Sequence, residues 1–446
     1  MNIAVFFTVR KINGGAYQYA MTFLEVLKQN PEHHYIIFNS SPDLPEEFLS
    51  LANFEVVDLQ KTSLRGSAQA ETKQSQSQEI AALPSVARND KKTNYRTKIK
   101  IHLYNLLLRL HLFPVLRLLT KISQKKLIYL INSKKIDLAI FTMTNKLAML
   151  LPIPVIVPIH DVEHRMRPEF PEVSSGKIWL QREYLCSQIA QHASKILVDS
   201  EIGRQDVINC YHPDPKKIVI LPFLPPNYLQ INSTQAEINN FLSKNHLPDK
   251  FLFYPAQFWP HKNHTNLVKA IGLLKQQGLI IPLVLTGAKK DRWGTWKQIQ
   301  SLIKEFNVTA QVHYLGYVDN AEITILYKQA VAMVIPTFLG PTNIPVYEAW
   351  QMGTPVLYSN IRGPREQAGN AALLFDPSRP ENIAEKIKLI WTDENLRKDL
   401  IEKGHKRLSL WTEKDFANKV NELIKEISFP SLRVHLADLT KTNITT

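Results

Sequence analysis

Cysteine is nearly absent from this chain. The 446 residues include only Cys186 and Cys210, and no Cys-X-X-Cys pair occurs. Disulfide-held proteins are rich in cysteine, and zinc sites need clustered Cys and His ligands. We therefore expect neither a disulfide framework nor a metal centre, and a reducing, cytoplasmic compartment is favoured.

Long apolar runs are also missing. The most apolar stretch, residues 101–120, is interrupted by Arg109, Pro114 and Arg117, whereas a spanning helix needs about 20 apolar residues. The opening residues MNIAVFFTVR lack the basic start and small-residue cleavage site of a signal peptide, so we interpret them as a strand. No membrane-spanning segment is predicted.

Acidic residues are lacking between residues 91 and 136, where Lys and Arg occur twelve times. The chain as a whole has a net charge of +14, and basic surfaces attract nucleic acids, anionic lipids and phosphorylated substrates. Residues 99–130 predict a basic amphipathic helix that either packs its leucines on the core or docks on an anionic membrane. No nucleic-acid-binding module is recognisable, so a nucleic-acid partner is not expected.

Two nucleotide-binding fingerprints are absent, G-X-G-X-X-G after a strand and G-X-X-X-X-G-K-[ST]. The chain nevertheless alternates short apolar runs with helical periodicity, which is typical of parallel sheets with crossover helices. Strands are predicted at residues 2–7, 35–38, 54–57, 137–141, 153–158 and 195–198, and again at 251–256, 283–286, 312–315, 332–335 and 356–359. The fold class is α/β.

The proline-rich segment LPFLPP at residues 221–226 divides the two alternating blocks. We predict a first domain over 1–222, a linker over 223–250, a second domain over 251–428 and a tail over 429–446. Residues 60–98 are polar and low in complexity and are predicted to be a disordered insertion. Two similar α/β units joined by a hinge put a cleft between them, with sites at the carboxyl ends of the strands.

The most informative stretch is residues 336–356, PTFLGPTNIPVYEAWQMGTPV. It predicts a strand, a Gly/Pro loop, a short helix that begins near Pro345 and ends at Gly353, and another strand. A helix N-terminus at the carboxyl end of a strand suits a diphosphate. Glu348 in the first turn of that helix either accepts hydrogen bonds from a ribose or only complements the helix dipole.

Two other positions carry candidate chemistry. Lys262 lies between a predicted strand and helix, where its ammonium could neutralise phosphate charge, although a single lysine is more often a surface charge. His160 follows the 153–158 strand and places an imidazole on the rim of the first domain, where an isolated histidine is more often structural.

Together these residues resemble the retaining glycosyltransferases of family 4, which have the GT-B architecture of two facing Rossmann-like domains. The resemblance covers nearly the whole chain outside residues 60–98. It implies that Glu348 binds the ribose, Lys262 the phosphate and His160 the transferred sugar. It further implies a donor site that includes Gly14, Gly15, Gln257, Gly316, Tyr317, Pro341, Thr342, Asn343 and Ile344.

Two positions depart from the family pattern. Gly340 stands where the family has the first of two glutamates, and Gln257 stands where a basic residue is usual five positions before the lysine. We take both as features of a branch within the family.

The expected function is transfer of a hexose from a nucleoside-diphosphate sugar to a saccharide or lipid-linked acceptor, with retention of configuration, in cell-surface polysaccharide or lipopolysaccharide synthesis. No cofactor or metal is expected, and the protein is expected in the cytoplasm or peripherally on the inner face of the plasma membrane. The alternatives are a catalytically silent sugar-nucleotide-binding protein and, less favoured, a basic nucleic-acid-binding protein.

Overall fold

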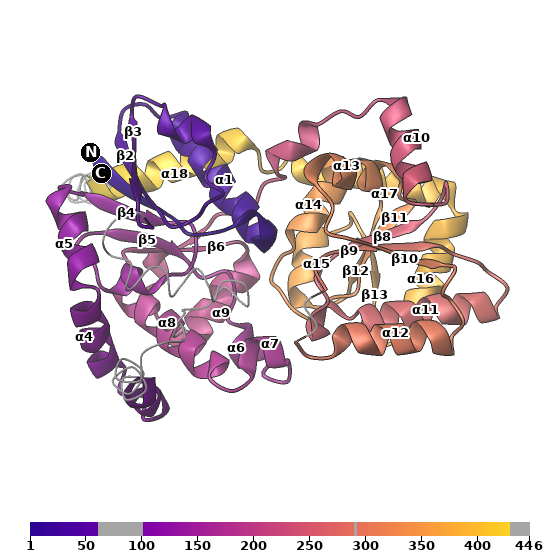
Figure 1. Cartoon of the computed structure of the whole chain (residues 1–446), viewed down its shortest axis with the longest axis horizontal. Helices are drawn as coiled ribbons and strands as arrows, with labels where there is room; N and C mark the ends of the chain where they lie inside the picture. Colours follow the sequence, from indigo (N-terminus) through magenta and orange to yellow (C-terminus); the bar gives the residue numbers. More distant parts are fainter. Residues whose placement is uncertain (61–100, 290–291, 429–446) are drawn as a thin grey trace, which may run out of the picture.

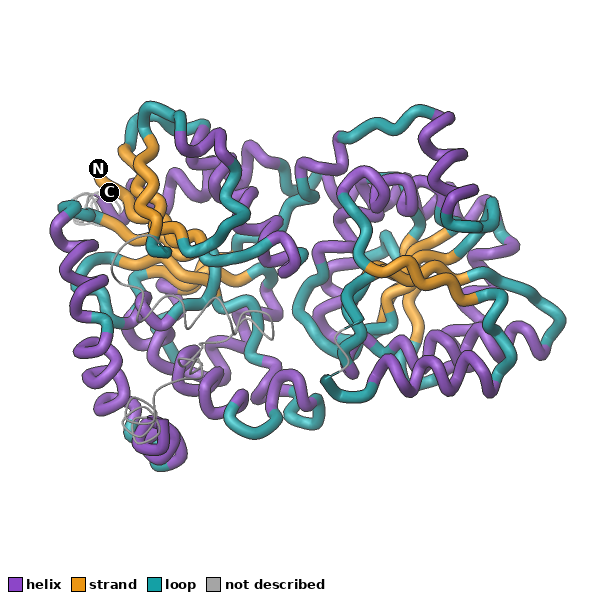
Figure 2. Tube along the Cα trace, viewed as in Figure 1, coloured by secondary structure: helices purple, strands orange, loops and turns teal. Residues whose placement is uncertain are grey.

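The computed structural model describes residues 1–60, 101–289 and 292–428. Two domains lie side by side, and each has a central sheet covered by helices on both faces (Figures 1 and 2). Every strand pairing in both sheets is parallel. The predicted α/β class, with two parallel sheets, is confirmed.

The first sheet has seven strands in the order β3-β2-β1-β4-β5-β6-β7. Its central strands are apolar almost without interruption because helices cover both faces. The strands are β1 (Asn2–Phe7), β2 (His34–Asn39), β3 (Phe54–Asp58), β4 (Leu138–Phe141), β5 (Val155–Pro158), β6 (Lys195–Val198) and β7 (Ile218–Ile220). Its helices are α1 (Gly15–Lys28), α4 (Phe113–Ser123), α5 (Lys125–Ser133), α6 (Glu163–Met166), α7 (Pro171–Ser174), α8 (Ile178–His192) and α9 (Glu201–Tyr211).

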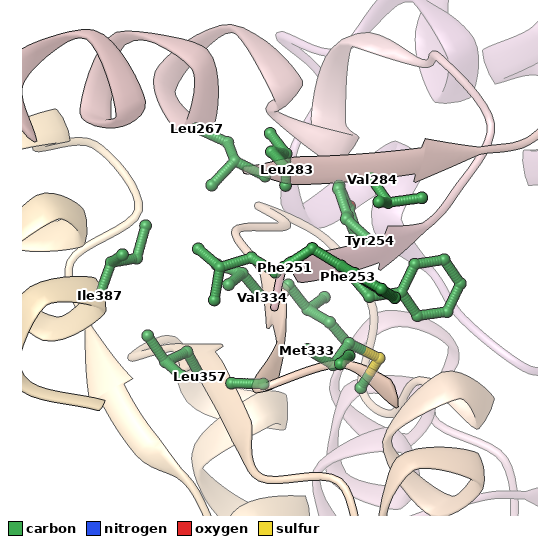
Figure 3. Packing of buried hydrophobic residues seen from close by; sticks show 14 of the residues in the cluster. Phe251, Phe253, Tyr254, Leu267, Leu283, Val284, Met333, Val334, Leu357 and Ile387 are labelled. Carbon is green, nitrogen blue, oxygen red and sulfur yellow. The ribbon is translucent and has the colours of Figure 1, made fainter. Parts of the chain in front are cut away.

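The second sheet has six strands in the order β10-β9-β8-β11-β12-β13. These are β8 (Leu252–Pro255), β9 (Leu283–Thr286), β10 (Val312–Gly316), β11 (Ala332–Ile335), β12 (Val356–Ser359) and β13 (Leu373–Phe375). Its helices are α10 (Gln235–Lys244), α11 (His264–Gln276), α12 (Thr295–Glu305), α13 (Asn320–Gln329), α14 (Ile344–Gln351), α15 (Arg362–Ala368), α16 (Pro380–Thr392) and α17 (Glu394–Leu408). Figure 3 shows side chains of the sheet and its helices meeting in one core, Phe251, Leu267 and Leu357 among them.

The last described helix, α18 (Glu413–Ser428), follows the second domain in the chain but packs on the first (Figure 1). Phe416, Val420, Leu423 and Ile424 belong to the core formed by β1 and α1. The ring of Phe416 lies 5.3 Å from that of Phe23 in an edge-to-face contact. The predicted second domain, 251–428, therefore has to be corrected at its end, because the apolar face of α18 is buried by the first domain.

The predicted basic helix over 99–130 is not continuous in the structure. Residues 101–109 are helical, and α4 and α5 follow as separate helices. His111 has a positive φ of 53°, and Pro114 is in the first turn of α4, where its missing N–H is tolerated. The chain turns at these residues, so the single predicted helix is wrong.

The predicted linker 223–250 contains a regular helix. Thr234 and Glu237 form a capping box at the start of α10, and Ile238 and Phe241 are buried in the core of the second domain. Two short strands, β7 and β13, were not expected, because three-residue strands carry too little alternation to be recognised. The tail 429–446 and the predicted insertion, apart from residue 60, lie outside the described residues.

Candidate active site

A cleft of about 450 Å³ lies between the two domains, at the carboxyl ends of their strands. The first domain contributes the Gly14-Gly15 loop after β1 and His160 after β5. The second domain contributes Gln257, Lys262, Tyr317 and the turn formed by Gly340, Pro341, Thr342, Asn343 and Ile344. Most of the residues predicted for the donor site therefore line one cavity.

Two predicted residues are not among those that line the cleft. Gly316 ends β10 with a φ of 79°, and its carbonyl accepts the N–H of Gly287 at 2.8 Å. Glu348 is buried in α14, where Tyr327 Oη donates a hydrogen bond to Glu348 Oε2 at 2.5 Å and Tyr228 donates another. Burial raises the pKa of Glu348, and the two tyrosines oppose that shift. Because Glu348 does not line the cleft, a ribose would reach it only after a local rearrangement, such as displacement of Tyr228 or Tyr327.

The turn before α14 is held rigidly by buried side chains. Asn343 N–H donates to Gln367 Oε1 at 2.8 Å, and Asn343 Nδ2 donates to Tyr358 Oη at 2.7 Å. The amide of Asn343 is therefore already occupied, contrary to its expected contact with a diphosphate. The N–H groups of Thr342 and Ile344 donate to no acceptor among the described residues, and both residues line the cleft.

Lys262 approaches the same turn from the other side. It ends the short 3₁₀ turn 260–262, and its Nζ donates to Asn343 Oδ1 at 3.3 Å. Tyr254 Oη donates to the carbonyl of Lys262 at 2.9 Å, which fixes the backbone of the loop. The ammonium group thus contacts the same turn as the two open amides, an arrangement of positive groups that would suit a diphosphate.

His160 is a neutral group at the cleft wall. Its ring packs edge-to-face on Tyr19 at 4.9 Å and lies 5.6 Å from Phe223. Burial lowers the pKa of His160 to about 4. The imidazole is therefore uncharged at neutral pH and can exchange hydrogen bonds with a sugar, but it adds no positive charge.

Of the two adjacent glycines of the first domain, Gly15 lies close to the turn and Gly14 does not. A Cβ on Gly15 would approach the side chain of Ile344 to 3.1 Å. Gly14 has a φ of 58°, which favours glycine. A side chain at position 15 would therefore require Ile344 to shift, whereas glycine at position 14 is favoured by its backbone conformation alone.

Carboxylates that sequence reasoning missed bridge the two domains around the cleft. Gly340 N–H donates to Glu163 Oε1 at 2.9 Å, and Thr342 Oγ1 donates to Asp199 Oδ2 at 2.5 Å. Glu172 Oε1 accepts both the backbone N–H and the Nδ1–H of His261, at 2.7 and 2.5 Å. Burial raises the pKa of both Glu163 and Asp199 to about 7.

The signal for two of these carboxylates is present in the sequence. Glu163 lies three residues beyond His160, and Asp199 comes directly after β6. Carboxyl ends of parallel strands are where α/β proteins place their sites, so both positions were candidates. Glu172 lies in the four-residue helix α7, and no local pattern indicates that it meets His261.

Comparison with known proteins agrees with this geometry. Residues 237–407 match the family glycosyl transferases group 1. The second domain is therefore similar to the group 1 glycosyltransferase domain over these residues.

The chain is 27% identical to the O-antigen chain mannosyltransferase B of Escherichia coli over 48% of its length and 55% of that protein. It is 24% identical to the O-antigen chain mannosyltransferase RfbU of Salmonella typhimurium over 52% of its length and 60% of that protein. The chain therefore matches little more than half the length of these relatives.

The fold is shared over a much larger part of the chain. The structure of Anabaena HepE in complex with UDP and glucose matches 96% of this chain and all of that one, with a TM-score of 0.65 and 14% identity. A glycosyltransferase from Rickettsia africae matches 96% and 98% of the two chains, with a TM-score of 0.64 and 15% identity. The predicted GT-B architecture of two facing Rossmann-like domains is confirmed.

The described residues form neither a metal cluster nor a membrane-spanning helix. Among the described residues, no group of three His, Cys, Asp or Glu side chains is placed to hold a metal ion. No helix in the described part of the chain is both long and apolar enough to cross a bilayer.

Proposed function

We propose that this protein is a glycosyltransferase that moves a hexose from a nucleoside-diphosphate sugar to a saccharide or lipid-linked acceptor, with retention of anomeric configuration. The observation that carries the proposal is the interdomain cleft in which Lys262 and the open amides of Thr342 and Ile344 form a positive pocket opposite His160. Because the two relatives named above are O-antigen mannosyltransferases, we propose mannose as the first sugar to test and surface polysaccharide synthesis as the process.

The chemistry follows from the charges in the cleft. Loss of the diphosphate from the sugar builds negative charge on the leaving group, and Lys262 with the helix N-terminus would stabilise it. Glu348 would hold the ribose after releasing one of its tyrosines. The closed contacts of Gly15 with Ile344 and of Glu172 with His261 would exclude water, which limits hydrolysis of the donor. The proposed site uses no divalent cation, and turnover in the presence of EDTA tests that part.

The helices formed by residues 101–109, α4 and α5 support a lipid-linked acceptor. Leu107, Leu108, Leu116, Leu127 and Ile131 pack into the first domain, so the inner side of these helices is core. Their outer side is also apolar, with exposed Leu103, Leu106, Leu110, Leu112, Val115, Leu118, Leu119, Ile122 and Tyr129. We call these nine residues the outer face.

Exposed basic residues surround the outer face, among them Arg109, Lys121, Lys125 and Lys126. Large apolar side chains in solvent are unfavourable, and basic residues near an anionic bilayer each add about 1 kcal/mol of attraction. We propose that the outer face docks on the anionic cytoplasmic leaflet, which places the protein peripherally on the inner side of the plasma membrane.

Binding and turnover test the enzymatic proposal. Calorimetry with GDP, UDP, ADP and dTDP should reveal one preferred nucleotide, and Lys262→Ala should weaken its binding. Incubation with GDP-mannose or UDP-glucose and an oligosaccharide acceptor should then give a product whose anomeric configuration NMR can assign. Binding without turnover for any acceptor would favour the silent sugar-nucleotide binder, and absence of nucleotide binding would refute both.

Vesicle sedimentation tests the membrane contact separately. Wild-type protein should sediment with vesicles that contain phosphatidylglycerol and not with pure phosphatidylcholine. The Leu118→Glu/Ile122→Glu variant should remain in solution, whereas Leu410→Glu, at an exposed leucine of the second domain, should behave as wild type. Equal sedimentation of all three proteins would rule out the outer face as the docking surface.

A further inference from the structure

Glu163 is a cleft residue whose carboxylate is only half used by the protein. It is the first residue of α6, and its Oε1 accepts the N–H of Gly340 from the opposite domain at 2.9 Å. Its Oε2 accepts no hydrogen bond from any described residue. Glu163, Gly340 and His160 all line the interdomain cleft.

Glu163 forms no salt bridge with any described residue, so a structural ion pair does not account for its burial. Burial raises its pKa to about 7, and the negative charge of Asp161 adds to that shift. The hydrogen bond from Gly340 and the more distant charge of Arg167 only partly offset it. A carboxylate in such a place destabilises the ligand-free protein, because its loss of hydration is not repaid by a cation. Perturbed groups of this kind in a cleft are candidates for ligand contact.

The neighbouring carboxylates are already engaged. Asp161 pairs with the guanidinium of Arg182. Both oxygens of Asp199 are used, Oδ2 by Thr342 and Oδ1 by Ser200. Glu172 accepts two hydrogen bonds from His261. Of these four carboxylates at the cleft, Glu163 is therefore the one that accepts no hydrogen bond from any described side chain, since its only donor is the backbone N–H of Gly340.

The location of Glu163 in the cleft determines which part of a bound donor its carboxylate can contact. Gly340 lies in the turn that leads to the open amide of Thr342, and Lys262 contacts the same turn at Asn343. We infer that a diphosphate held there would place its sugar beside Gly340, which lines the cleft, has no side chain and has a φ of 107° that disfavours one. The wall opposite Gly340 at this point is the segment of the first domain that contains His160 and Glu163.

We propose that Glu163 is a sugar-binding residue whose unused carboxylate oxygen accepts hydrogen bonds from hydroxyl groups of the transferred hexose, which the first domain therefore recognises. This inference rests on the proposed function of the cleft. The sugar hydroxyls replace the water that burial removes from the carboxylate. Hydrogen bonds to a charged acceptor are about twice as strong as those between neutral groups, so the contact contributes to sugar selection.

The test compares each nucleoside diphosphate with its sugar nucleotide by calorimetry, using GDP with GDP-mannose and UDP with UDP-glucose. Glu163→Ala should weaken binding of the preferred sugar nucleotide about tenfold or more, whereas affinity for the matching nucleoside diphosphate should change less than twofold. Glu163→Gln keeps an oxygen for Gly340 and should give a smaller loss. Glu201→Gln, whose carboxylate pairs with Arg204 inside the first domain, is the matched control and should bind both ligands as wild type.

The possible outcomes separate the two proposals. If Glu163→Ala weakens nucleoside diphosphate and sugar nucleotide equally, Glu163 acts only by holding the Gly340 turn, and the sugar contact is wrong. If the variant binds both ligands as wild type does, Glu163 has no role in donor binding. If wild-type protein binds none of these four ligands and neither ADP nor dTDP, the proposed function itself fails and this inference fails with it.

Discussion

The contact between Glu172 and His261 joins the two domains next to Lys262. The side chains are almost fully buried, with exposed fractions of 1% and 8%. Burial by itself raises the pKa of Glu172, but the hydrogen bonds from His261 outweigh it and the pKa lies below its ordinary value. Burial lowers the pKa of His261 to about 4, so the imidazole is neutral and the contact is a pair of hydrogen bonds rather than an ion pair.

Glu172→Ala removes the acceptor for two buried donors. Each buried donor that loses its partner costs about 1–3 kcal/mol. If the domains separate, water can hydrogen-bond to both donors. The free energy needed to open the domains therefore sets an upper limit on the cost of the substitution. We expect Glu172→Ala to destabilise the closed form by about 2–4 kcal/mol. Glu172→Gln retains an oxygen acceptor and should cost less than half as much.

Small-angle scattering and calorimetry measure this effect. Glu172→Ala should increase the radius of gyration and should weaken nucleoside-diphosphate binding, because only the closed fraction brings the Gly14-Gly15 loop of the first domain to a ligand held at Lys262. Since the contact is not an ion pair, the difference between variant and wild type should change little with salt. The reasoning would be refuted if Glu172→Ala kept the wild-type radius of gyration and nucleotide affinity while remaining folded by circular dichroism.

Three further predictions concern single residues. Lys262→Ala should weaken nucleoside-diphosphate binding about 10- to 100-fold without lowering Tm, measured by calorimetry and thermal unfolding, because the loop backbone is fixed by Tyr254. Phe416→Ala should destabilise the first domain by about 3–5 kcal/mol in urea unfolding, because the ring is fully buried; a loss confined to the second domain would contradict the packing of α18. Burial raises the pKa of Asp199 to about 7, whereas its value in the unfolded chain is near 4. The stability that the protonated Asp199 contributes is therefore fully present below about pH 4 and is lost as the pH rises through 7. Asp199→Asn cannot ionise and should therefore raise Tm relative to wild type more at pH 8 than at pH 5; an equal difference at both would contradict the raised pKa.

The sequence by itself determined the two parallel sheets and much of the cleft. Runs such as 2–7, 195–198 and 283–286 are recognisable because strands covered on both faces are continuously apolar. Asp319 and Glu322 form the capping box that their spacing indicates at the start of α13. Loops that follow such strands must meet at one edge of a sheet, so Lys262 and the 341–344 turn could be placed together from local patterns.

Only the tertiary structure determines which residues of one domain contact the other domain. The contacts of Glu163 with Gly340 and of Asp199 with Thr342 join residues 177 and 143 positions apart, and no short-range pattern encodes such distances. The apolar face of α18 indicates burial but not which domain buries it. Glu348 was correctly placed in its helix, yet only packing shows that Tyr228 and Tyr327 already occupy it. Local spacing determines helices, strands and caps because they depend on near neighbours, whereas the partners of buried polar groups depend on how distant surfaces fit together.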